Sequence, residues 1–179
     1  MSRDSDTTSD DRAPPGVYEV TFGFEAGPED EAFHTAFIID MGGRREAFGG
    51  SRAITVPEDE LMRAVLMMLA GAWRADAVFE HEPGRGVLSF RRICLNPLPE
   101  GASLPPEQLW RPIWSVEVTY DEPNGRPWDD HWRFGAVPSP LHLARAVLEM
   151  AERFFEGRAP SEALVALRGA VRQAEAQAR

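Results

Sequence analysis

The segment Trp128–Trp132 is the place in the sequence where residue types that do chemistry cluster, since it reads Trp-Asp-Asp-His-Trp. On a strand, Asp129 and His131 share a face, and a carboxylate and an imidazole at that spacing can bind one metal ion. A metal site needs further ligands, and the three other histidines have no fixed spacing to this pair. We therefore predict an exposed polar strand face with no metal, and keep a small metal-dependent enzyme using Asp129 and His131 as the alternative.

Composition excludes other routes to catalysis. All 19 basic residues are arginines, so there is no lysine for a phosphate-binding loop, a Schiff base or a pyridoxal phosphate anchor. Cys94 is the single cysteine, which excludes an internal disulfide and a cysteine-built zinc or iron–sulfur site, and its apolar neighbours indicate a small buried hydrophobe. The sequence also lacks a Gly-x-Ser-x-Gly nucleophile motif and a glycine-rich nucleotide fingerprint. We expect no enzyme, no catalytic residue and no cofactor.

The charge is strongly acidic and unevenly spread. The chain has 29 Asp and Glu against 19 Arg, a net charge of −10. Residues 1–82 carry 17 acids and 7 arginines, whereas residues 83–179 carry 12 of each. This balance argues against nucleic-acid binding, because phosphates repel an acidic surface. Solubility and a basic protein partner are the two remaining explanations.

Eight carboxylates on two predicted hairpin loops are the candidates for contact with a basic partner. They are Glu25, Glu29, Asp30 and Glu31 on the first loop, and Asp121, Glu122, Asp129 and Asp130 on the second. Two tryptophans beside the proline-rich segment Asn96–Trp110, namely Trp110 and Trp114, are candidate apolar anchors of the same contact. The alternative for both tryptophans is a place in the core.

Alternating apolar and polar residues predict antiparallel strands. Strands at 17–24 and 32–40 flank the first acidic loop, and a third, edge strand falls within 41–50. Residues 77–82 and 87–95 form a further hairpin, and residues 113–135 another. In this last hairpin we expect Val118 opposite Trp132 and Val116 opposite Phe134, because that register keeps the loop prolines out of the ladder.

Three helices are predicted. Residues 55–73 start with Pro57 near three acids and are then apolar nearly all round, which is typical of a buried helix with Trp73 in the core. A second helix begins after Ser139 and ends at Gly157, and Ser161 caps a third.

These elements predict one α+β domain at residues 16–179, preceded by a disordered acidic tail at residues 1–15. Its core is an antiparallel sheet of about five to seven strands with one buried helix, and a C-terminal helical hairpin packs on one face. No apolar stretch approaches the ~20 residues of a membrane span, and the first residues lack the apolar centre of a signal peptide. With a single thiol, the expected location is the cytoplasm, with no membrane contact.

Part of the sequence resembles small α+β immunity proteins of bacterial polymorphic-toxin systems. The resemblance covers about half of the chain, and the segments that carry it are Val137–Pro160, Val56–Val65 and Gly86–Phe90. The resemblance implies an acidic protein that binds and blocks a basic toxin domain without doing chemistry. A chaperone or assembly factor that binds through its C-terminal helices is a further alternative.

Overall fold

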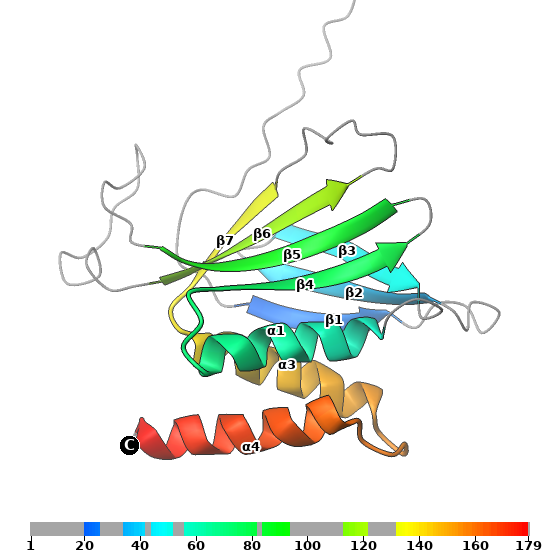
Figure 1. The fold of residues 1–179 in the computed structure, drawn as a ribbon. Coiled ribbons are helices and arrows are strands. Elements are labelled where there is room, and N and C mark those ends of the chain that lie inside the picture. The colour runs from blue at the N-terminus through cyan, green and yellow to red at the C-terminus, as the bar shows by residue number, and fades with distance from the viewer. Residues whose placement is uncertain are drawn as a thin grey trace, which may run out of the picture.

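The structure, a computed structural model, describes residues 20–25, 34–41, 44–51, 56–81, 84–93, 113–121 and 132–178. Two antiparallel sheets contain the described strands (Figure 1). The first sheet has the order β1 (Val20–Glu25), β2 (His34–Met41), β3 (Arg44–Ser51). The second has the order β4 (Arg74–His81), β5 (Gly84–Ile93), β6 (Ile113–Asp121), β7 (Trp132–Val137). The described helices are α1 (Pro57–Leu69), α3 (Pro140–Phe154) and α4 (Glu162–Gln177).

The α+β class is confirmed, but the expectation of one sheet of five to seven strands is wrong. The helix α1 stands between β3 and β4 in the chain, so these strands are not joined by a tight turn. They make contacts with each other but no ladder, which leaves three strands in one sheet and four in the other.

The elements form three layers. In Figure 1 the two sheets lie above α1 and α3, and α4 lies below these two helices. The helix α1 packs mainly on β4, whereas α3 packs on β1, so each helix contacts the first strand of a different sheet. We predicted that both helices of the C-terminal hairpin pack on the sheet. This is confirmed for α3, but α4 packs on α1 and α3 instead.

One hydrophobic cluster joins the sheets and helices. On β4 the buried residues Ala75, Ala77 and Phe79 alternate with polar or partly exposed ones, as in a strand with one covered face. The helix α1 contributes Leu61, Val65, Met68 and their neighbours, which confirms the predicted buried helix. The exposed fraction of each of these side chains is 2% or less, so each adds about 1–3 kcal/mol of hydrophobic free energy.

The β6–β7 register is confirmed at one end and displaced at the other. Val118 pairs with Trp132 and Glu117 with Arg133, as expected. A register shift between Val116 and Glu117 then brings Gly135 opposite Val116, where Phe134 was predicted. The strand β7 therefore carries an extra residue at this point, the property of a β-bulge.

The helix ends follow local sequence rules with one exception. Ser161 caps α4 by accepting a hydrogen bond from the Leu164 amide at 3.2 Å, as predicted. Ser139 makes no such bond to α3, because its hydroxyl lies 2.8 Å from His142 Nδ1 instead. The helix α1 ends in a Schellman motif, in which Gly71 has a φ of 96° and Ala72 N donates to Met67 O at 3.0 Å.

Candidate functional site

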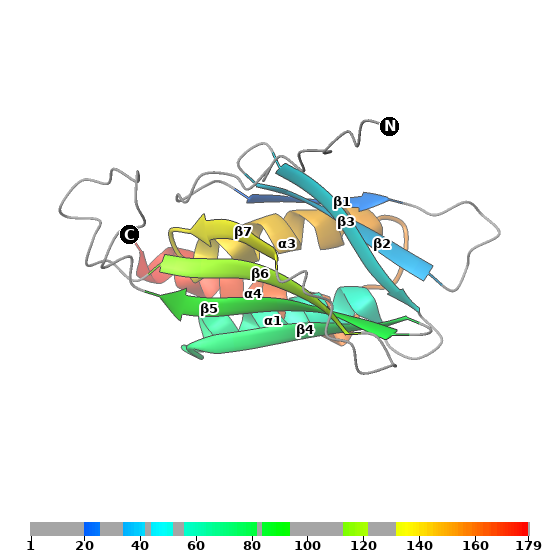
Figure 2. The same cartoon turned by 90° about the horizontal axis from the view of Figure 1, so that it is seen from above.

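The chain ends of several elements gather at one end of the molecule, which we call the acid end. Both views place there the last residues of β1, β4 and β6 and the first residues of α1 and α4 (Figures 1 and 2). The acidic residues at these positions are Glu25, Glu58, Asp59, Glu60, Glu80, Asp121 and Glu162. The loops that carry the predicted carboxylates, residues 26–33 and 122–131, leave from this end. The fold thus brings the starting points of the two predicted acidic loops to the same end.

Two carboxylates in the first turn of α1 already have partners within the fold. Asp59 accepts a hydrogen bond from the Ser161 hydroxyl at 2.7 Å, and Glu60 pairs with Arg63 at 2.9 Å. In the ladder, Arg85 lies opposite both Glu80 on β4 and Asp121 on β6, so the row alternates acid, base, acid. Asp59 and Glu60 therefore stabilise the scaffold itself, and the first turn of α1 also places its acids at the positive end of the helix dipole.

The predicted partner-binding residues fall into three groups. Glu25 and Asp121 are the last residues of β1 and β6 at the acid end. Trp114 lies in β6 with an exposed fraction of 5%. The others lie outside the described residues: Glu29, Asp30, Glu31, Trp110, Glu122, Asp129 and Asp130, together with His131 of the alternative metal site.

The charge of the chain divides sharply between described and other residues. The described residues carry 15 acids and 13 arginines, a net charge of −2. The remaining residues carry 14 acids and 6 arginines, a net charge of −8. Most of the charge excess is therefore carried by the termini and the segments that join the elements, where the predicted acidic loops lie.

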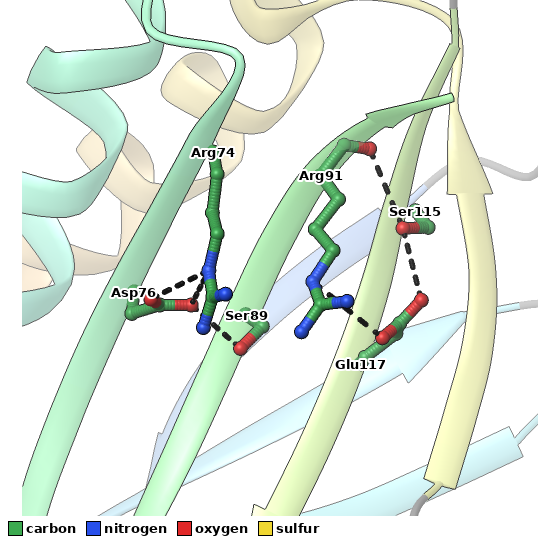
Figure 3. A network of polar contacts seen from close by, with 6 residues as sticks. All are labelled: Arg74, Asp76, Ser89, Arg91, Ser115 and Glu117. Carbon is green, nitrogen blue, oxygen red and sulfur yellow. Dashed lines mark hydrogen bonds and ion pairs between the residues drawn. The ribbon is translucent and has the colours of Figure 1, made fainter. Parts of the chain in front are cut away.

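The outer face of the four-stranded sheet carries a polar network (Figure 3). Across β4, β5 and β6, one row consists of Arg74, Arg91 and Ser115, and the next of Asp76, Ser89 and Glu117. Asp76 accepts from Arg74 Nε at 2.8 Å and from the Ser89 hydroxyl at 2.6 Å. Ser115 donates to Glu117 Oε1 at 3.2 Å. Each serine thus bridges to a carboxylate beside or across from it, which stabilises the strand register.

Glu117 is a buried carboxylate in this network, since its exposed fraction is only 2%. Arg91 Nε lies 3.9 Å from Glu117 Oε2, and Arg133 lies opposite Glu117 on β7. Taking a carboxylate out of water is costly unless charges and donors surround it. The network contains no imidazole that could act as a base for either serine, so its geometry fits a structural role rather than nucleophilic catalysis.

Trp73 lies outside the core where it was predicted, and Trp114 occupies the core, one of its two predicted places. Trp73, expected in the core, is 69% exposed, whereas Trp114, a candidate interface anchor, belongs to the core cluster. Arg92 connects them, since its amide donates to Trp73 O at 2.8 Å and it pairs with Trp114 in the β5–β6 ladder. The physical reason lies in this row, because Trp114 is on an interior strand while Trp73 precedes the edge strand β4.

The exposure of Trp73 is the feature that sequence reasoning missed. Its signal was Gly71, which ends α1 two residues before Trp73 and so excludes the tryptophan from the apolar face of the helix. In contrast to Trp73, most large apolar residues of the C-terminal helix α4 are buried. The apolar face of α4, with Leu164, Leu167 and Val171, is buried against α1 and α3, which leaves Val165 as its exposed large hydrophobic residue.

The described part of the chain contains no group of three His, Cys, Asp or Glu side chains arranged to hold a metal ion. Among the same residues, no helix is long and apolar enough to cross a membrane. Comparison with known proteins found no matching family model, no matching curated protein and no matching solved structure. The resemblance to immunity proteins therefore stays a prediction.

Proposed function

We propose that this chain is a non-enzymatic binding protein of the immunity type, which blocks a basic protein partner by covering it. The division of charge supports the proposal most directly. The described helices and strands have a net charge of only −2. The termini and the segments that join these elements together have a net charge of −8. The two predicted acidic loops, residues 26–33 and 122–131, carry six acids and one arginine, so they account for −5 of this charge. A cluster of one sign on two neighbouring segments favours attraction of a basic partner.

The mechanism follows from electrostatics. Acidic loops that leave from one end of the molecule create a local negative potential, which attracts a basic protein and orients it before contact. At contact, Glu29, Asp30 and Glu31 on one loop and Glu122, Asp129 and Asp130 on the other pair with arginines and lysines of the partner. The scaffold carboxylates contribute less, because Asp59 and Glu60 already hold Ser161 and Arg63.

A charge-neutralising variant tests the proposal. The chain is co-expressed with the proteins encoded beside it, and the affinity of any complex is measured by titration calorimetry. Replacing Glu29→Gln, Asp30→Asn and Glu31→Gln together should weaken binding about tenfold, or about 1.4 kcal/mol.

The matched control removes the same charge from the scaffold. Glu149, Glu152 and Glu156 lie exposed on and just after α3, and the first two pair with Arg153 and Arg168. Their joint replacement by Gln should change the affinity by less than about twofold. Equal losses in both variants would show that only the net charge matters, and a complex with an acidic protein would contradict the proposal.

A further inference from the structure

The end of the molecule opposite the acid end exposes two large apolar side chains from adjoining segments. Met67 on α1 is 52% exposed and Trp73 is 69% exposed. The Schellman motif links them, since Ala72, the residue before Trp73, donates its amide proton to Met67 O at 3.0 Å. Tryptophan and methionine are enriched in protein interfaces, and a tryptophan is the residue most often found at a binding hot spot.

The backbone holds Trp73 in place although its side chain faces water. The carbonyl of Trp73 accepts from the Arg92 amide at 2.8 Å, which extends the β4–β5 ladder by one position. Gly71, with its φ of 96°, sets the turn that precedes it. A preorganised backbone reduces the entropy lost when a partner covers the side chain.

One exposed arginine, Arg92, shares a face of the sheet with Trp73, whereas Arg74 and Arg91 belong to the polar network on the opposite face. Arg74, Arg91 and Arg92 lie at the same end of β4 and β5 (Figure 1). Arg74 pairs with Asp76 at 2.8 Å, and Arg91 lies 3.9 Å from Glu117. Arg92 is exposed and has no ion pair within the part of the chain that the structure describes. By side-chain alternation, Arg92 and Trp73 lie on the same face of the sheet, the face that α1 covers further along β4.

We propose that Met67, Trp73 and Arg92 form a second docking surface, which takes an apolar protein segment that carries a carboxylate. Trp73 and Met67 bury the apolar residue, and the Arg92 guanidinium pairs with the carboxylate. The charge of this surface is opposite to that of the acidic loops, so its partner differs in chemistry from the basic protein of the proposed function. The two surfaces lie at opposite ends of the fold, so both can be occupied together.

The probe is a displayed library of random linear peptides, selected on the wild-type protein alone. We expect enriched peptides to place an aromatic or aliphatic residue next to Asp or Glu. Affinity of a synthetic enriched peptide should fall about tenfold or more with Trp73→Ala and with Arg92→Glu.

Matched controls lie on α4, where Val165 is 56% exposed and Arg172 is exposed. Val165→Ala and Arg172→Glu should change the peptide affinity by less than about twofold, and all four variants should keep the wild-type unfolding midpoint. The proposal is overturned if no peptide is enriched, if binding does not depend on Trp73, or if the peptides are basic. Enrichment of basic peptides would indicate binding to the acidic loops. That result would support the proposed function and contradict the docking surface at Met67, Trp73 and Arg92.

Discussion

The acid end and the Trp73 end of this molecule are built in opposite ways. At the acid end, Asp59 and Glu60 are paired within the fold, with Ser161 and Arg63, and the surplus charge is on the joining segments. At the Trp73 end, Met67, Trp73 and Arg92 are exposed, although their backbone is held by hydrogen bonds of the ladder and of the Schellman motif. The difference teaches that a surplus of charge and exposed apolar side chains lead to separate proposals, a basic partner for the first and an apolar, acidic segment for the second.

The largest expected effect is the difference in stability between variants of Trp114 and Trp73, the two tryptophans on either side of Arg92. Trp114→Ala should lower the free energy of unfolding by about 3–5 kcal/mol, because it leaves a cavity in the core. Trp73→Ala should change it by less than about 0.5 kcal/mol, since the side chain is mostly in water. Urea denaturation measures both, and equal losses would remove the contrast between buried and exposed positions.

Glu117 tests whether the sheet between the two ends depends on its buried charge. Glu117→Gln should cost about 1–3 kcal/mol, because it removes a buried carboxylate that accepts from Ser115 and lies beside Arg91. Arg91 is 40% exposed, so solvent screening keeps the loss toward the lower value. The exposed Glu156→Gln is the control and should be nearly neutral in the same denaturation experiment.

Ser161 tests the acid end. Ser161→Ala removes both the cap on Leu164 N and the hydrogen bond to Asp59, so we expect a loss of about 1–2 kcal/mol in unfolding free energy. Ser139→Ala is the matched control, because Ser139 occupies the same position before α3 without capping it. A similar loss in the two variants would mean that neither the cap nor the bond to Asp59 contributes to stability.

Gly71 tests the turn that presents Trp73. Gly71→Ala should destabilise the protein by about 1 kcal/mol, because its φ of 96° strains any residue with a Cβ, although the space around it is open. Gly169→Ala, inside α4 and equally open, should have the opposite sign and stabilise by about 0.5–1 kcal/mol. Thermal unfolding of the pair distinguishes backbone strain from a general effect of added methyl groups.

The smallest effect concerns the surface between α3 and α4. Arg145 pairs with Glu175 at 2.8 Å in an exposed setting. A double-mutant cycle with alanine at both positions should give a coupling energy below about 1 kcal/mol that shrinks as salt is added. A larger coupling energy that does not depend on salt would show that this ion pair contributes substantially to stability.

Local patterns made much of this fold predictable. The apolar run after Pro57, the Ser161 cap and the β4–β5 hairpin each depend on neighbouring residues, and all three are present. The features that were not predicted depend on residues far apart in the chain. The Asp59–Ser161 bond spans 102 positions, and the roles of Trp73 and Trp114 depend on which strand lies at the edge of the sheet. For the candidate site, the sequence predicted where acidic residues are concentrated. It did not predict that Asp59 and Glu60 are paired within the fold, because those contacts depend on the folded structure.

We propose above all that the carboxylates of the two predicted acidic loops bind a basic protein. The measurement that tests it most directly is the affinity of the co-expressed complex as a function of ionic strength, for the wild type and for the Glu29→Gln, Asp30→Asn, Glu31→Gln variant. Our account predicts that wild-type affinity falls steeply between low and high salt and that the variant has a clearly shallower slope. A complex whose affinity does not change with salt, or whose slope is the same in both proteins, would contradict it.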